Sequence, residues 1–233
     1  MPTEILGLDP SFMLDIFPRL LEALWVTIQI SFLAVIFGTI AGVFFGSLRV
    51  IGPRPVKLSI QAMVDFIRGV PQLIIILIVF YVLPNFGIVF NEFWTGVIAL
   101  TIIAAGYEVE IVRASVESID HGQREAAMSI GMHPRMAFAQ IILPQAARRM
   151  TPAITNELAN TVKSSSLLSV IAVNELMKIG YGLINRYFLV FEVLIQLTIL
   201  YMITIGFLLL VSNYLENRVF AFGGAVGLRQ EAR

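Results

Sequence analysis

Three long stretches of the chain contain no charged residue. They are Ala23–Leu48, Gly69–Asn91 and Val193–Leu215. A membrane-spanning helix needs about 20 mostly apolar residues, and each stretch is long enough to cross a bilayer. The pattern therefore predicts three transmembrane helices.

Two further stretches are more polar but still favour spanning helices. Phe93–Tyr107 is uncharged yet short, and its helix can continue through Glu108 to Arg113. Thr151–Val173 is expected to become helical near Pro152, because proline is tolerated in the first turn of a helix. This last stretch contains Asn156, Glu157, Asn160 and Lys163. The chain is thus expected to be an all-α integral membrane protein with five transmembrane helices.

Composition supports a membrane protein and excludes several chemistries. Hydrophobic residues make up 58% of the chain and charged residues 14%, and the mean hydropathy is +0.85. Soluble domains are about 45–50% apolar and about 25% charged. The formal net charge of +0 gives no field that would attract nucleic acid, and the absence of cysteine excludes disulfides and thiolate chemistry. The first 22 residues have no basic region before an apolar core, which argues against a cleaved signal peptide.

Basic residues are distributed unevenly between the two sides of the predicted membrane domain. Cytoplasmic loops carry the excess of lysine and arginine, so the N-terminus is expected outside and the C-terminus in the cytoplasm. This gives an outer segment (1–22), one membrane domain (23–218) and a cytoplasmic tail (219–233). The three basic residues on the outer side are Arg19, Lys178 and Arg186. The ten on the cytoplasmic side are Arg49, Arg54, Lys57, Arg124, Arg135, Arg148, Arg149, Arg218, Arg229 and Arg233.

Small residues form a stripe in the first span. Gly38, Gly42 and Gly46 follow one another at intervals of four, with Ala34 one turn earlier. Such a stripe lets another helix backbone approach closely, which drives helix association inside lipid. The partner helix could belong to a second subunit or to the same chain, and the pattern does not decide between them.

The segment between the third and fourth spans is basic, rich in small residues and expected on the cytoplasmic side. Gln123–Ile130 has good helix formers, and Gly131 permits a sharp change of direction. Pro134 is expected to open a second helix, Arg135–Ile142, which Pro144 interrupts. Two short helices joined by a turn would form a knob that docks in a groove on a partner. The alternative is an amphipathic helix lying on the bilayer surface.

Four motifs resemble, in order and spacing, those of ABC importer permeases of the polar amino acid family. The segment EAAMSIG (125–131), followed by IILP (141–144), resembles the cytoplasmic EAA loop. FIRGVP (66–71) is similar to the FRGTP-type motif, YEVEIVR (107–113) to the YxxEIxR segment, and KSSSL (163–167) to the K-[SD]-[ST]-S-L segment. The matches span roughly residues 20 to 218.

The resemblance implies a type I importer permease of five transmembrane helices in a bacterial cytoplasmic membrane. Such a chain would form a homo- or heterodimer of permeases on two ATP-binding subunits, which would hold ATP and Mg. A periplasmic or lipid-anchored solute-binding protein would deliver a polar amino acid. The outer segment would be periplasmic, and the EAA loop (about 117–150) would dock into the ATPase. The chain itself contains no GxxxxGK[ST] sequence for phosphate binding. By this resemblance the coupling residues would be Gln123, Glu125, Ala126, Ala127, Gly131, Pro134 and Arg135.

Charged residues inside the predicted spans form two expected local pairs. Asp65 and Arg68 lie three residues apart and can pair along one helix, and Glu110 and Arg113 can do the same, with Glu117 one turn further on. Both pairs are interpreted as structural. Losing one partner of a buried pair is costly, because the remaining charge is stranded.

Glu108 and Lys163 have no oppositely charged neighbour one turn away. Ionisable residues at membrane depth suggest a functional site. Asn156, Asn160 and Lys163 share one helix face, which should line a watery path. Glu108 and Lys163 could pair with each other or contact the two charges of an amino acid. Glu108 also stands where the family more often has a small or polar residue, and it could select a cationic side chain.

Two other classes of protein remain as alternatives. A secondary transporter could use Glu108 and Lys163 as an ion relay, and an oligomeric channel could associate through the glycine stripe. The absence of an inverted repeat counts against the first, and the EAA pattern counts against both. An enzyme is not expected, because His121 and His133 are accompanied by no metal-binding or nucleophilic constellation.

Overall fold

The structure, a computed structural model, describes residues 8–218, which are helical with no strand. The elements run as α1 (Pro10–Ile51), α2 (Arg54–Gly69), α3 (Gln72–Tyr81), η1 (Leu83–Phe86), α4 (Glu92–Glu117), α5 (His121–Ser129), α6 (Pro134–Ala137), η2 (Phe138–Ile142), α7 (Leu143–Ser164), η3 (Ser165–Ile171), α8 (Leu176–Tyr187) and α9 (Val190–Arg218).

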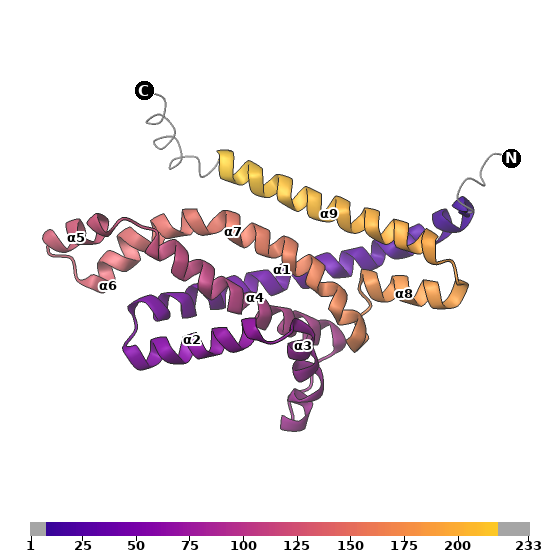
Figure 1. The fold of residues 1–233 in the computed structure, drawn as a ribbon, viewed down its shortest axis with the longest axis horizontal. Coiled ribbons are helices and arrows are strands. Elements are labelled where there is room, and N and C mark those ends of the chain that lie inside the picture. Colours follow the sequence, from indigo (N-terminus) through magenta and orange to yellow (C-terminus); the bar gives the residue numbers. More distant parts are fainter. Residues whose placement is uncertain (1–7, 219–233) are drawn as a thin grey trace.

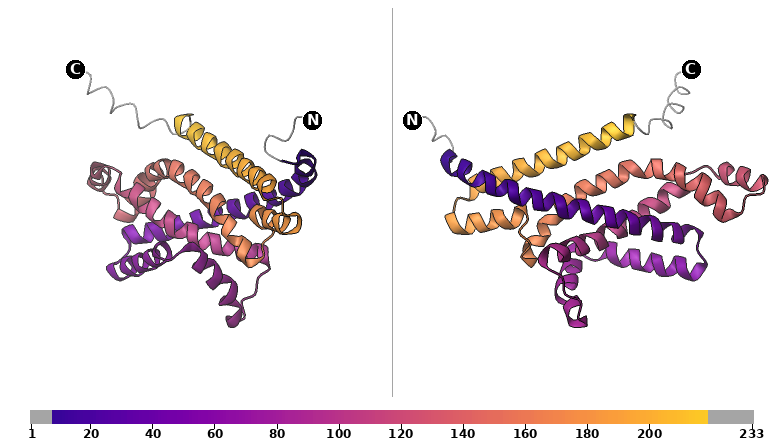
Figure 2. Two further views of the ribbon diagram at one scale, coloured as in Figure 1. Left: turned by 45° about the vertical axis from the view of Figure 1, so that its right-hand side comes forward. Right: turned by 180° about the vertical axis from the view of Figure 1, so that it is seen from behind.

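The long helices α1, α4, α7 and α9 run lengthwise through an elongated bundle (Figure 1). One end of the bundle carries α5 and α6, and the opposite end carries α8; we call these the α5 end and the α8 end. The short helix α3 projects sideways from the long helices (Figure 2). The arrangement agrees with the expected all-α fold class.

Three of the described helices, α1, α4 and α9, are long and apolar enough to cross a membrane. The number rises to five if two bent helix pairs each count as one span. The predicted span Gly69–Asn91 is helical only in part, because α3 and η1 end at Phe86 and residues 87–91 are not helical. Helix α3 is also bent by 103° relative to α2. The bend lies at Val70 and Pro71, where proline keeps the preceding residue out of the helical region.

Helix α1 begins at Pro10 and not at the predicted Ala23. The side chain of Asp9 caps the helix by accepting hydrogen bonds from the backbone of Ser11 and Phe12 at 3.0 and 3.1 Å. The early turns are stabilised because Ile16 and Leu20 are buried against α8 and α9. Tertiary packing therefore extends the helix into the segment assigned to the outer side.

The glycine stripe packs within the same chain. Gly38, Gly42 and Gly46 are buried in α1 and face α4. A Cβ atom added at Gly42 would lie 2.7 Å from the Cβ of Glu108, and one added at Gly46 would lie 2.7 Å from that of Val112. The close approach of α1 and α4 needs these glycines, so the stripe serves helix packing inside the protomer.

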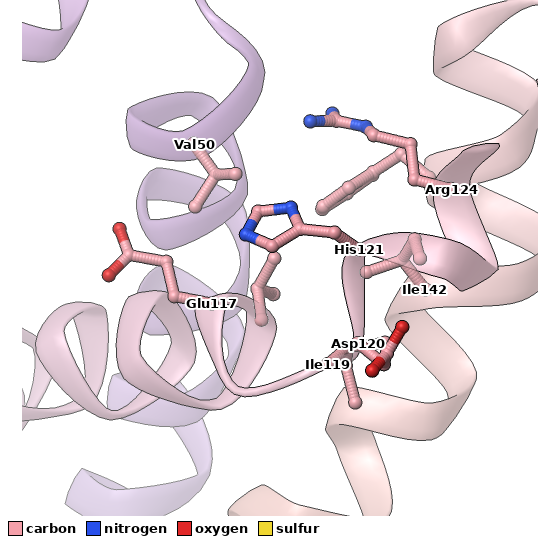
Figure 3. Close-up of a pocket in the computed structure, with 9 residues that line it drawn as sticks. Val50, Glu117, Ile119, Asp120, His121, Arg124 and Ile142 are labelled. Carbon is pink, nitrogen blue, oxygen red and sulfur yellow. The ribbon is translucent and has the colours of Figure 1, made fainter.

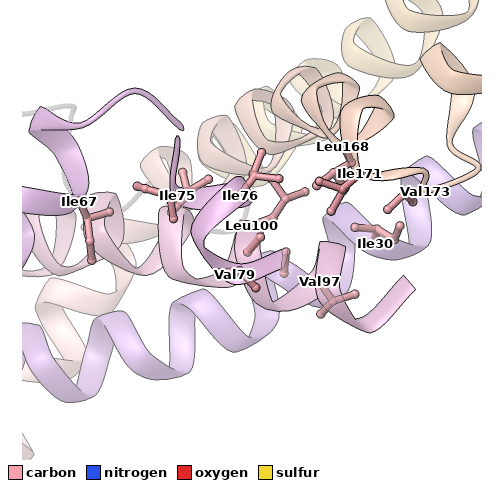
Figure 4. Packing of buried hydrophobic residues seen from close by; sticks show 13 residues of the cluster. Ile30, Ile67, Ile75, Ile76, Val79, Val97, Leu100, Leu168, Ile171 and Val173 are labelled. Carbon is pink, nitrogen blue, oxygen red and sulfur yellow. The ribbon is translucent and has the colours of Figure 1, made fainter. Parts of the chain in front are cut away.

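The core lies where α1, α3, α4 and η3 meet. Figure 4 shows this cluster of buried aliphatic side chains, with Ile76, Leu100 and Leu168 fully or almost fully buried. The cluster joins segments distant in sequence around the middle of the bundle, and it leaves the α5 end and the α8 end to separate packing.

The chain passes Pro144 without a break. The predicted interruption is wrong, because η2 is a π-helical turn in which the Leu143 N–H bonds to the Phe138 carbonyl. This wider turn accommodates a proline, which lacks an N–H and whose ring clashes with the carbonyl four residues earlier. Helix α7 thus begins at Leu143 instead of near Pro152, which lies within it.

Candidate functional site: a docking knob and a polar face

Helices α5 and α6 form a knob at the α5 end (Figure 1). Gly131, with φ of +84°, lies between them in the left-handed region that favours glycine. Its N–H bonds to the Met128 carbonyl at 3.0 Å, and the Met132 N–H bonds to the Ala127 carbonyl at 3.2 Å. These two bonds are a Schellman turn, which ends α5 and reverses the chain before Pro134 opens α6.

Most of the predicted coupling residues lie on the surface of the knob. Ala127 differs, because it is 5% exposed and therefore packs inside the knob. Sequence analysis missed three apolar side chains on the same surface, Met128, Ile130 and Met136, which are 48%, 80% and 49% exposed. Their signal was the presence of large apolar residues in an otherwise polar segment. The exposed coupling residues are Gln123, Glu125, Ala126, Gly131, Pro134 and Arg135.

The knob is attached to the long helices by polar contacts from α7. Arg149 donates to the Ser118 carbonyl at 2.6 Å and to its hydroxyl at 2.9 Å, between α4 and α5. Gln145 donates to the side chain of Gln123 at 3.2 Å. Buried Phe138 and other apolar residues close the base of the knob. The knob is thus held by both helices that lead into it.

A small cavity lies beneath the knob (Figure 3). The ring of His121 projects between the side chains of Val50 and Glu117. The volume is about 90 Å³, whereas ligand pockets are roughly 300–1,000 Å³. We interpret this space as a packing gap of the knob.

An ionic cluster joins three helices near the α5 end. Glu110 of α4 accepts from Arg113, as the sequence predicted, and also from Arg49 of α1. Arg49 donates in addition to Gln61 of α2, and Arg113 to Glu117. Sequence analysis missed Arg49, because its partner is distant in the chain. The cluster ties α1, α2 and α4 together.

The expected pair between Asp65 and Arg68 does not form. Asp65 accepts a hydrogen bond from Gln61 at 2.6 Å, and the guanidinium of Arg68 lies over the Tyr107 ring at 5.4 Å from its centroid. Both residues are exposed on α2. Each side chain therefore finds a nearer partner, one on its own helix and one on α4.

Arg68→Ala is accordingly expected to have only a small effect on stability. An exposed cation–π contact contributes about 0.5–1 kcal/mol, and no buried charge is stranded by its loss. Thermal unfolding of the purified protein in detergent would measure the effect. Glu110→Gln is the matched comparison, because it removes the acid at the centre of the ionic cluster and should lower the unfolding temperature more. A larger loss for Arg68→Ala would contradict this assignment.

Glu108 is fully buried between α1 and α4. Neither of its carboxylate oxygens has a hydrogen-bond partner, and its Cβ lies against Gly42. Among the described residues it makes no ion pair, and Lys163 donates to Asn160 at 3.1 Å. The structure therefore contains no pair between Glu108 and Lys163.

A polar face runs along α7. Three side chains of this face are exposed in the protomer: Asn156, Asn160 and Lys163. Exposure is expected of a stripe that does not pack inside the protomer. Lipid does not satisfy such groups, so a watery path or a partner chain should cover them.

The comparisons with known proteins agree with this geometry. The family model described as "Binding-protein-dependent transport system inner membrane component" matches residues 34–221. The probable glutamine ABC transporter permease protein GlnM of Bacillus subtilis is 32% identical, over 91% of this chain and 98% of its own length. The arginine transport system permease protein ArtQ of the same organism is 30% identical, over 92% and 98%.

A solved structure has the same fold. It is described as the crystal structure of an amino acid ABC transporter with histidines, and it aligns with a TM-score of 0.84 at 31% identity. The alignment covers 91% of this chain and 100% of that one. The fold is thus one already seen in a solved amino acid ABC transporter.

Proposed function

Because this chain belongs to the family of inner membrane components of binding-protein-dependent transport systems, we propose that it is the permease subunit of an ATP-driven importer for a polar amino acid. The permease role follows from the family, and the names of GlnM and ArtQ support an amino acid as the substrate. We propose a bacterial inner-membrane subunit that pairs with a second permease chain. The N-terminus lies outside and the C-terminus in the cytoplasm.

The knob carries this proposal, because it has the properties of a docking element. It extends beyond the long helices and presents Met128, Ile130 and Met136 beside the exposed Glu125. Exposed apolar residues with a polar surround mark protein interaction sites. We propose that the knob docks into an ATP-binding subunit, which holds ATP and Mg.

The polar face of α7 is proposed to line the substrate path. Asn156, Asn160 and Lys163 offer amide groups and one ammonium, which can bind the carboxylate of an amino acid. Together with a second permease chain, this face would enclose a polar route through the bilayer. Alternating access would open that route to each side in turn.

Substitutions in the knob test the coupling role. Gly131→Val places a β-branched residue at positive φ, which costs on the order of 1–3 kcal/mol locally and should distort the turn. Glu125→Arg reverses a charge on the exposed surface. We expect both variants to co-purify less ATP-binding subunit and to lose transport-coupled ATP hydrolysis.

Gly206→Val is the matched control for Gly131→Val. A Cβ atom at Gly206 of α9 would meet nothing within 4 Å, and no positive φ is recorded there. This control should retain both the complex and its activity. If Gly131→Val and Glu125→Arg also retain both in full, the knob is not the coupling element.

A further inference from the structure

The three basic residues assigned to the outer side by the charge distribution line one cavity at the α8 end. Arg19 comes from α1, and Lys178 and Arg186 come from α8; Asn174 and Gly182 also line the space. The cavity volume is about 290 Å³. In the part of the chain that the structure describes, none of these three cations forms an ion pair.

Helix α8 supplies a regular basic face to this cavity. Lys178, Gly182 and Arg186 follow one another at intervals of four, so they lie on the same side of the helix. A Cβ atom at Gly182 would meet nothing within 4 Å, which leaves open space between the two charged side chains. Leu183, buried against α1 and α9, fixes the orientation of this helix.

None of the described acids near the cavity forms an ion pair with its three cations. The carboxylate of Glu175 is buried and accepts the backbone N–H groups of Met177 and Lys178 at 2.9 and 2.6 Å, so it is committed to capping α8. Asp15 and Glu22 flank Arg19 on α1 but are exposed and do not line the cavity. The result is a concave site whose lining holds three cations and no acid.

We propose that this cavity binds carboxylate side chains on an acidic face of the solute-binding protein. The proposal rests on the proposed function, which places the α8 end outside, opposite the knob. Arginine forms bidentate hydrogen bonds with carboxylates, and three convergent cations can hold one or two of them.

An anionic lipid surface fits this site less well. Recognition of lipid headgroups typically uses a spread cluster of about 4–8 basic residues beside the membrane. Here only three cations converge, and they do so in a hollow instead of on an extended surface. A carboxylate side chain that projects from a protein surface can enter such a hollow.

The first test measures ATP hydrolysis by the complete complex in nanodiscs as its substrate-loaded solute-binding protein is titrated. With Lys178→Glu and Arg186→Glu together, the half-maximal concentration should rise at least tenfold, and its dependence on salt should weaken, because the attraction is electrostatic. Basal hydrolysis should not change. Arg54→Glu, an exposed cation on α2 near the α5 end, is the matched control and should leave the titration unchanged.

The second test detects the contact by chemical cross-linking, and it needs only the wild-type chain and one conservative substitution. A zero-length carbodiimide joins a lysine amine to a carboxylate in contact with it, so Lys178 should cross-link to the solute-binding protein. Lys178→Arg keeps the charge but removes the amine, and it should bind normally and lose the cross-link.

Three results would overturn the proposal. One is an unchanged titration for the double variant, and another is the absence of a cross-link at Lys178. The third is an effect seen only when phosphatidylglycerol is added to phosphatidylcholine nanodiscs, which would assign the site to lipid headgroups. A wild-type complex that does not respond to its solute-binding protein would instead refute the proposed function, and this site with it.

Discussion

Gly42→Leu is expected to prevent accumulation of the folded protein in the membrane. The added Cβ atom alone would lie 2.7 Å from the Cβ of Glu108 and 3.2 Å from its backbone carbonyl carbon. The helices α1 and α4 would have to separate along the most extensive contact between any two of the described helices. Overpacking costs about 1–3 kcal/mol where neighbours can adjust, and here a backbone atom must move. Membrane yield and thermal unfolding in detergent measure the loss.

Gly206→Leu is the matched control for this prediction, because α9 has open space at that position. The same substitution in another apolar helix should leave yield and unfolding temperature near those of the wild type. If Gly42→Leu behaves like Gly206→Leu, the close packing of α1 on α4 is wrong. A loss only of dimerisation, with a stable protomer, would instead favour the contact between subunits that the glycine pattern left open.

The membrane helices were predictable where apolar residues fill the whole helix surface. Val193–Leu215, for example, lies entirely inside α9. Helix α8 was missed, and α2 was expected only around Asp65 and Arg68. Both helices are amphipathic and much of their surface is polar, so hydropathy alone does not distinguish them from loops. Their burial depends on specific contacts, such as Ile67 of α2 in the central core and Leu183 of α8 against α1 and α9.

The knob was predictable because its turn is local. Gly131 and Pro134 act through their own backbone conformations, and both have the roles expected from the sequence. The ionic partners were only partly predictable. A spacing of three or four residues identifies contacts within one helix, but it does not identify contacts between helices. Glu110 and Arg113 satisfy that rule, whereas Arg49 reaches Glu110 only after α1 and α4 have packed.

The glycine stripe of α1 accounts for the burial of the acidic residue Glu108. Gly42 allows α1 to approach so closely that the Glu108 side chain has no exposed surface and neither oxygen is hydrogen-bonded. Burying such a group without a partner costs free energy. A residue that is unfavourable for folding is best explained by a role in transport, since functional sites commonly lower stability. We therefore propose that Glu108 contributes to selecting a cationic substrate.

Glu108→Gln is expected to keep or raise thermal stability while it weakens transport of basic amino acids. The amide has nearly the shape of the carboxyl group but cannot ionise, so the substitution never leaves a charge buried between α1 and α4. If Glu108 meets a cationic group when the path opens, losing that charge-assisted bond costs about 1.5–3 kcal/mol, or roughly ten- to a hundredfold in affinity. Uptake of arginine and of glutamine into proteoliposomes, measured beside the unfolding temperature, separates the two effects.

Glu110→Gln, which alters an ion-paired acid on the same helix, should lower stability and reduce uptake of both substrates equally. The same result for Glu108→Gln would assign Glu108 to the structure of the bundle and exclude the substrate role.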